Sequence, residues 1–105
     1  MVSKERAFEL IQDSFGSLQR AGLLADKIVA SAETVLLGIG SPLDSIGFVT
    51  FIAEMEDRLY RETARDIYLI LDDIHTFNIE NPYLTIDALA RYIVMITGSQ
   101  KEKHG

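Results

Sequence analysis

The sequence predicts an all-α fold, a small four-helix bundle with a long first loop and a short third helix. With 105 residues and two prolines, the chain suits one domain around one core. Apolar residues recur at three- and four-residue intervals in three long segments, which is typical of amphipathic helices. One short apolar run, at residues 66–71, could form a strand, but we see no second run to pair with it. We expect a single domain over residues 1–98 and a flexible polar tail over residues 99–105.

The first helix is expected from residue 4 to residue 20. Ser3 is a suitable N-cap, because its hydroxyl can accept a hydrogen bond from a free backbone N–H of the first turn. Gly22 is a suitable stop. The apolar residues that would face the core are Phe8, Ile11, Phe15 and Leu18.

Residues 23–43 are expected to form a long, ordered loop with one short helical turn at most. Loops of this length without secondary structure are usually functional or disordered, and apolar anchors argue against disorder. Gly38 and Gly40 provide flexibility shortly before residue 45. The residues expected to anchor the loop to the core are Leu23, Leu24, Ile28, Val29, Val35, Leu36 and Leu37.

The second helix is expected from Ser45 to about Arg61. Asp44 is a good N-cap, which puts the Ser45 hydroxyl on the exposed first turn, at the positive end of the helix dipole. Helix N-termini favour anions, so this serine is well placed to carry a phosphodiester. The stripe expected to face the core is Phe48, Ile52, Met55 and Leu59, and a small apolar shoulder beside the serine comprises Ile46, Val49 and Ala53.

Residues 62–82 favour extended chain followed by a short helix at residues 72–77, which Asn81-Pro82 would end. Thr85 then caps a final helix, and Gly98 is expected to end it. The side expected to be buried is Ile86, Leu89, Ala90, Ile93, Val94 and Ile96.

Charge and composition exclude several classes of protein. The net charge is −6, and residues 44–90 hold ten acidic side chains against three arginines, so nucleic acid would be repelled. The same acidic face suits a partner with a basic docking patch, although charge runs are often only solvated helix faces. No apolar run approaches the length of a membrane span, and no cysteine is present. We expect a cytoplasmic monomer without membrane insertion.

Three blocks of the sequence resemble discrete acyl carrier proteins in content and order. They are residues 36–47 (LLGIGSPLDSIG), residues 53–59 (AEMEDRL) and residues 84–93 (LTIDALARYI). In that family an Asp-Ser-Leu or Asp-Ser-Ile motif begins the second helix, which here is Asp44-Ser45-Ile46. A bare tripeptide is a weak signal, and three blocks in the right order are a much stronger one.

The resemblance implies a carrier and not an enzyme. A phosphopantetheinyl transferase would attach 4′-phosphopantetheine from coenzyme A to Ser45, with Asp44 as the cap beside the site. The arm would hold acyl or aminoacyl groups as thioesters for ligases, synthases or acyltransferases of lipid, polyketide or related biosynthesis. The cargo stays open, and Gly47 and Thr50, where many fatty-acid carriers have acidic residues, favour a specialised member. The residues expected to dock partner enzymes are Ile46, Val49, Ala53, Glu54, Glu56 and Asp57.

Family carriers often enclose an acyl chain between their helices, which implies a space in the core here. The residues expected to line such a space are Phe48, Ile52, Met55, Leu59, Ile70 and Ile93.

Three other interpretations compete with the carrier. A nucleophilic Ser45 would need a general base; the only histidines are His75 and His104, of which His104 is in the polar tail, and Asp44 is better used as a cap. Acidic groups near His75 and in residues 54–57 lack the spacing of zinc or EF-hand sites, so we expect no metal site. The serious alternative is an unmodified acidic helical protein-interaction module, which would not require the Asp-Ser-Ile motif.

Overall fold

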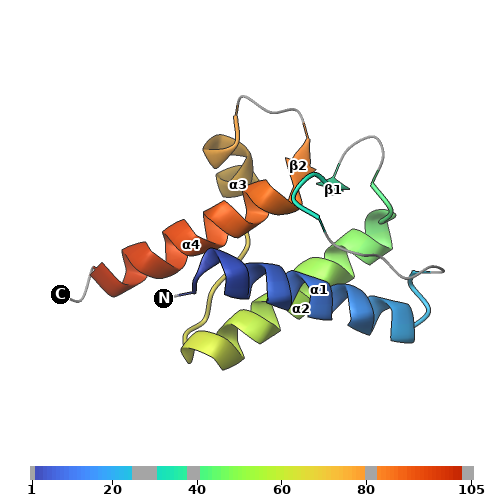
Figure 1. Cartoon of the computed structure of the whole chain (residues 1–105), viewed down its shortest axis with the longest axis horizontal. Coiled ribbons are helices and arrows are strands. Elements are labelled where there is room, and N and C mark those ends of the chain that lie inside the picture. Colours follow the sequence, from blue (N-terminus) through green and yellow to red (C-terminus); the bar gives the residue numbers. More distant parts are fainter. Residues whose placement is uncertain (1, 25–30, 38–40, 80–82, 103–105) are drawn as a thin grey trace.

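The computed structural model describes residues 2–24, 31–37, 41–79 and 83–102. In these residues the chain forms four helices and a small two-stranded sheet, as Figure 1 shows. The mostly helical fold is therefore confirmed, and the sheet is a departure from the all-α prediction. The elements in chain order are α1 (Lys4–Arg20), β1 (Val35–Leu37), α2 (Ser45–Thr63), α3 (Leu71–Phe77), β2 (Leu84–Thr85) and α4 (Ile86–Glu102).

The core lies where α1 packs against both α2 and α4. The rings of Phe15 and Phe51 stack at its centre, with their centroids 5.2 Å apart. Phe51 is fully buried although the predicted stripe omitted it, whereas Ile52 of that stripe is only half-buried. The core side of α2 is therefore rotated slightly from the predicted stripe. The other predicted stripe residues, Phe48, Met55 and Leu59, are buried.

Helix α1 has the predicted bounds. The Ser3 hydroxyl accepts a hydrogen bond from the Arg6 amide at 3.1 Å, as expected of an N-cap. Gly22 follows the end of the helix with a φ of 81°, a conformation that glycine adopts without strain. The Val2 amide donates to the Thr97 hydroxyl at 3.1 Å, which ties the start of α1 to α4.

Strands β1 and β2 pair antiparallel, with Val35 opposite Thr85 and an irregularity before Leu37. The strand lies within residues 23–43, so the prediction of a loop without a strand is wrong there. Its pairing partner is nearly fifty residues away, and no local pattern in a three-residue strand indicates that pairing. Leu24 and Leu36 are buried as predicted, whereas Leu37 is 43% exposed. Residues 28, 29, 38 and 40 lie outside the described residues.

The segment before β1 also holds the start of α4. The Ile86 amide donates to the Thr34 carbonyl at 3.0 Å, and the Asp87 amide donates to the Ala32 carbonyl at 3.1 Å. Thr85 caps the helix as predicted, since its hydroxyl accepts from the Ala88 amide at 3.2 Å. These bonds satisfy backbone donors that the first turn of a helix leaves free.

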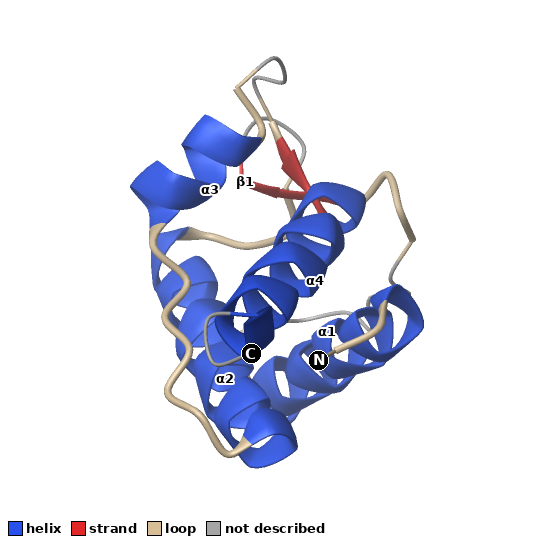
Figure 2. Cartoon of the chain, turned by 90° about the vertical axis from the view of Figure 1, so that its left-hand side faces the viewer, coloured by secondary structure: helices blue, strands red, loops and turns tan. Residues whose placement is uncertain are grey.

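The connection from α2 to α3 runs back along α2, as Figure 2 shows. It is extended over residues 66–70, and α3 follows it, so the predicted extended chain and short helix are confirmed. Burial alternates along the extended part: Ile67 and Leu69 are buried, while Tyr68 and Ile70 are exposed. The prediction that Ile70 lines a space in the core is therefore wrong, because extended chain exposes alternate residues. Asn81 and Pro82 lie outside the described residues.

Helix α4 continues to Glu102, so the predicted stop at Gly98 is wrong. A glycine inside a helix costs about 1 kcal/mol relative to alanine, which does not end a helix. Residues 99–102 of the predicted flexible tail are therefore helical, and residues 103–105 lie outside the described residues. Ile86, Leu89, Ala90 and Ile93 are buried as predicted, and Ala88 and Tyr92 join them.

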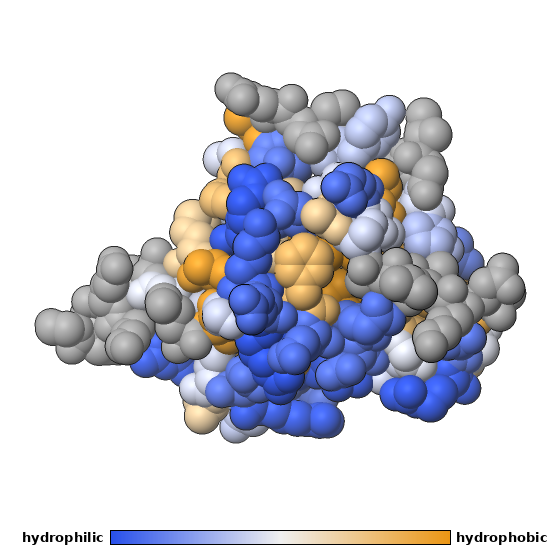
Figure 3. Space-filling model, in the orientation of Figure 1, coloured by the Kyte–Doolittle hydropathy of each residue, from blue (hydrophilic) through white to orange (hydrophobic). Residues whose placement is uncertain are grey.

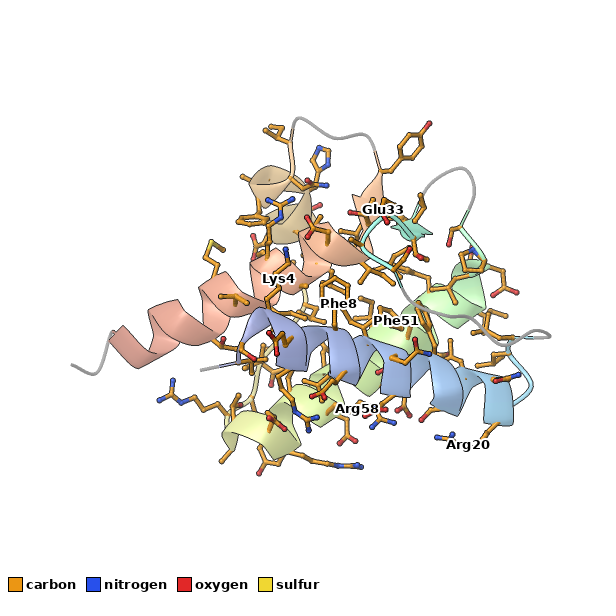
Figure 4. The ribbon with its side chains drawn as sticks, in the orientation of Figure 1. Lys4, Phe8, Arg20, Glu33, Phe51 and Arg58 are labelled. Carbon is orange, nitrogen blue, oxygen red and sulfur yellow. The ribbon has the colours of Figure 1, made fainter. Side chains whose placement is uncertain are left out.

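One face of the molecule is largely hydrophilic, with a small apolar area at its centre (Figure 3). Figure 4, in the same orientation, places Phe8 there, and this side chain is partly buried against the core. Among the described helices, we find none that combines the length and the apolar character needed to cross a lipid bilayer.

Candidate functional site at the start of the second helix

Ser45 is the first residue of α2, and it is exposed. Asp44 precedes it in an extended conformation, with its carboxylate Oδ1 accepting from the Gly47 amide at 2.6 Å. The Asp44 carbonyl accepts from the Phe48 amide at 2.8 Å. The predicted cap is confirmed, and it fixes where the helix begins. Figure 1 shows that this end of α2 lies on the same side of the molecule as β1.

Gly47 allows the cap to close. A Cβ at this position would lie 3.1 Å from Asp44 Oδ1 and 3.6 Å from Leu43 Cδ2. The first of these distances is tighter than most real Cβ contacts, so a larger residue would push the cap outward by a few tenths of an ångström. A structural role therefore accounts for the glycine that stands where many fatty-acid carriers have an acidic side chain.

Ser41 differs from Ser45 in how its hydroxyl is used. Its Oγ donates to the Leu36 carbonyl at 2.7 Å and accepts from the Leu43 amide at 3.1 Å. These bonds hold the segment that precedes α2 against β1. By contrast, the Ser45 hydroxyl makes no hydrogen bond to any residue that the structure describes, so it is the free hydroxyl of the pair.

An open groove of about 440 Å³ lies beside Ser45, between β1 and the first turns of α2. Its walls are mainly apolar, and the polar groups at its edge include Asp44 and Ser45. This groove could not be predicted from the sequence, because one of its walls depends on the unpredicted strand. The lining residues are Leu36, Leu37, Ser41, Leu43, Asp44, Ser45, Phe48 and Val49. A group attached to Ser45 could rest its apolar part in this groove.

The first turn of α2 carries no acidic residue after the cap. The amides of Ser45 and Ile46 are unbonded within the described chain, because the first N–H groups of a helix have no partner inside it. Free amides and the helix dipole together make the local field favourable to an anion. The electrostatics at Ser45 therefore suit an attached phosphate.

The predicted apolar shoulder is exposed. Ile46 is 69% and Val49 is 67% exposed, and Ala53 is exposed as well. Large apolar side chains at this degree of exposure, next to a free serine hydroxyl, are available to contact a partner. Their role in docking stays a prediction.

The acidic docking residues are less free than the sequence suggests. Glu54 pairs with Arg58 at 3.4 Å, and Asp57 pairs with Arg61 at 2.6 Å. Glu56 Oε2 accepts from the Leu69 amide at 2.8 Å, which holds the extended segment against α2. Each of these carboxylates therefore has a partner within the chain, so the six predicted docking residues form an exposed apolar group and a separate, internally paired acidic group.

Arg58 also bridges helices. Its guanidinium donates to the Ser17 hydroxyl at 2.7 Å, and Figure 4 shows Arg58 beside α1. The side chain that pairs with Glu54 is therefore also held on α1.

The chain offers no other reactive group next to Ser45 in the part that the structure describes. His75 is exposed on α3, and no hydrogen bond connects it to Ser45. Among the described residues, no three His, Cys, Asp or Glu side chains are placed so that they could hold one metal ion. His104 lies outside them.

Comparisons of the chain with models of protein families, with curated proteins and with solved structures find no match. The site must therefore be interpreted from its own residues and geometry.

Proposed function

We propose that this chain is an acyl-carrier-like protein that bears a 4′-phosphopantetheine arm on Ser45. The observation that supports this most directly is the exposed, unbonded hydroxyl of Ser45 at the start of a capped helix. An attachment site needs a hydroxyl that a modifying enzyme can reach on a rigid element, and Ser45 meets both conditions. In this proposal the protein passes acyl or aminoacyl groups between biosynthetic enzymes.

The positions of the three resembling blocks support the proposal. Residues 36–47 include the last two residues of β1 and the start of α2, residues 53–59 lie in the middle of α2, and residues 84–93 comprise β2 and the first half of α4. The first block therefore contributes to the groove, and the second lies in α2. The third includes the first turn of α4, which the segment before β1 holds. The small sheet is a feature that the resemblance did not lead us to expect.

The residues around Ser45 fit the proposed arm. When bound, the arm supplies a terminal thiol that carries an acyl group as a thioester. Ser45 Oγ would lose its proton and bond to the phosphorus on the pantetheine side of coenzyme A, while the pyrophosphate P–O bond breaks and the adenosine bisphosphate half leaves. The free amides of the first turn would stabilise the resulting phosphodiester. Leu36, Leu43 and Phe48 offer an apolar wall along which an extended group can lie.

Asp44 acts in this proposal through position and not through chemistry. Its carboxylate is occupied by the Gly47 amide, so it holds the start of the helix and thereby the direction of the serine side chain. Ser41 also acts by positioning, because its hydrogen bond holds the chain just before the site against β1.

The alternative of an unmodified interaction module would use the same exposed residues, Ile46 and Val49. It would not require the Asp44-Ser45-Ile46 motif or an unbonded serine hydroxyl behind the Asp44 cap, and this chain has both. We therefore favour the carrier.

The test is the intact mass of the purified protein after incubation with coenzyme A, Mg²⁺ and a promiscuous phosphopantetheinyl transferase. The wild type and Ser41→Ala should each gain the mass of one phosphopantetheine group, and Ser45→Ala should gain none. Ser41→Ala is the matched control, because it removes a nearby serine hydroxyl that is bonded within the chain. Modification of Ser45→Ala would refute the assignment, and an unchanged wild type under conditions that modify a known carrier would favour the interaction module.

A further inference from the structure

The groove beside Ser45 has few polar side chains that are free to pair with a guest. The Ser41 hydroxyl is already bonded to the Leu36 carbonyl and the Leu43 amide, and Ser45 itself would be the point of attachment. Asp44 is the remaining polar side chain, and it lies at the serine end, where one of its oxygens binds the Gly47 amide. The other walls are apolar: Leu36, Leu37, Leu43, Phe48 and Val49.

These walls suit an aliphatic chain better than the arm itself or a charged cargo. A phosphopantetheine arm contains two amide groups, and an aminoacyl group carries an ammonium. Placing either of them against apolar side chains removes water without replacing its hydrogen bonds, which costs free energy. Methylene groups gain free energy in the same place, because the burial of apolar surface is favourable. The chemistry of the groove therefore selects an alkyl chain.

The size and shape of the groove also fit one such chain. Its volume of about 440 Å³ lies in the lower half of the range of small-molecule sites, roughly 300–1,000 Å³. The groove is open along one side, and Leu37, which is 43% exposed, forms part of its rim. A chain that lies here stays within reach of an enzyme that must act on it.

The core is a less suitable place for the same chain. Met55, Leu59 and Ile93, which were expected to line a space there, are fully buried. Met55 Sδ lies 3.2 Å from the hydroxyl of Ser14, a fully buried residue that donates to the Leu10 carbonyl at 2.9 Å. A guest would have to displace close-packed side chains and push Met55 away from this hydroxyl. The groove requires no such displacement, because it is already open.

We propose that the arm on Ser45 carries an aliphatic acyl chain and not an aminoacyl group, and that this chain folds back into the groove between β1 and α2, outside the helical core. The inference rests on the proposed function for the arm and on the groove for the choice of cargo. The pairing of β1 with β2 then has a role in cargo binding, because it holds Leu36 and Leu37 beside the first turns of α2.

The experiment tethers alkyl chains to residue 45 without any transferase. The chain contains no cysteine, so Ser45→Cys provides a single thiol at the edge of the groove, to which alkyl methanethiosulfonates attach a methyl, butyl, hexyl or octyl group as a mixed disulfide. The melting temperature should rise by roughly 1–3 °C for each added methylene, since the open groove covers the chain only in part. An ether chain as long as the octyl group should give no rise. A melting temperature that is independent of alkyl length, or an equal rise with the ether chain, would overturn the proposal.

Amide NMR spectra and two variants distinguish the groove from the core. Between the methyl and octyl forms, the amide resonances of Leu36 and Leu37 should move, and those of Met55 and Ile93 should not. Leu37→Ala should reduce the gain in melting temperature by roughly half, because it removes part of one wall. Ile70→Ala is the matched control and should leave the gain unchanged, because Ile70 is 52% exposed and does not line the groove.

Each gain is measured against the methyl form of the same variant, so a change in overall stability cancels. An unchanged gain in Leu37→Ala, or shifts confined to the core residues, would overturn the proposal.

Loading of the wild-type chain separates this inference from the proposed function. A promiscuous transferase is supplied with octanoyl-coenzyme A or alanyl-coenzyme A, and intact mass reports whether each group is attached. The octanoyl form should differ from the alanyl form in the amide resonances of Leu36 and Leu37. Loading without this difference would refute the inference and leave the proposed function standing. A failure to load either group would refute the proposed function and with it the cargo, while the alkyl series would still decide whether the groove binds a chain.

Discussion

Replacing Asp44 by alanine tests how the site is held in place. The substitution removes the 2.6 Å hydrogen bond from the Gly47 amide to Oδ1, which is the side-chain cap of α2. Loss of an N-cap costs about 0.5–2 kcal/mol, typically about 1, and loss of the negative charge at the helix N-terminus adds about 0.3–1 kcal/mol. For a chain of this size, a loss of 1 kcal/mol lowers the melting temperature by about 4–8 °C.

The assay is thermal unfolding followed by far-UV circular dichroism. Asp44→Asn should keep most of the stability, because an asparagine side-chain oxygen caps about as well as a carboxylate. Asp66→Ala is the control for removing an exposed aspartate that caps nothing, and it should change the free energy of unfolding by less than about 0.5 kcal/mol.

The same two variants also show whether Asp44 only holds Ser45 in position or takes part in the attachment reaction. If Asp44 acts only as a cap, Asp44→Asn should accept the phosphopantetheine arm at the wild-type rate, while Asp44→Ala should accept it more slowly. The reasoning is refuted if Asp44→Ala has the same melting temperature as the wild type, or if Asp44→Asn lowers the melting temperature as much as Asp44→Ala does.

Three further predictions concern the framework around the site. Phe51→Ala should lower the free energy of unfolding by about 3–5 kcal/mol, and Ile52→Ala should lower it by less than about 2 kcal/mol, because only Phe51 is fully buried. Urea denaturation measures both losses. Equal losses would mean that the core side of α2 is misassigned. Two hydrogen bonds of 2.9 Å from Arg6 hold the pKa of the Glu62 carboxyl below its usual value, so their contribution to stability is present at neutral pH and lost as the pH falls below about 4. Glu62→Gln should therefore flatten the acid limb of a plot of unfolding free energy against pH, and an unchanged limb would contradict the pairing. Glu56→Gln should speed hydrogen exchange of the Leu69 amide, whereas Asp57→Asn, one residue along, should not; equal exchange in both variants would show that Glu56 does not hold the segment.

Local signals in the sequence were sufficient to predict where the three long helices start. Ser3, Asp44 and Thr85 were expected to cap three helices, and each accepts the hydrogen bond that a cap requires. A cap needs only residues within one turn of one another, so a single sequence contains the information. The start of α2, and with it the location of Ser45, could be predicted for this reason.

Non-local contacts account for the parts that could not be predicted. The pairing of Val35 with Thr85 joins distant segments, and three-residue strands leave too little pattern to reveal it. Ile70 was expected to line a space in the core, but it is exposed, because Ile67 and Leu69 take the inward positions of the extended segment and the Leu69 amide binds Glu56 on α2. The stop at Gly98 failed because a glycine ends a helix only when the chain turns there.

The same distinction applies to the candidate site. Ser45 and Asp44 are local features, and the sequence located them. The groove beside them needs β1, and the internal pairing of the acidic docking residues needs Arg58, Arg61 and Leu69 in their folded positions.

The most direct test of the central claim is the intact mass of the protein purified from its native cell, followed by fragmentation to locate any added group. The account predicts an excess over the mass of the unmodified chain that equals one phosphopantetheine group, with or without an acyl or aminoacyl load, and fragmentation should place it on Ser45. A chain recovered entirely at its unmodified mass, or a modification located on a different residue, would contradict the account.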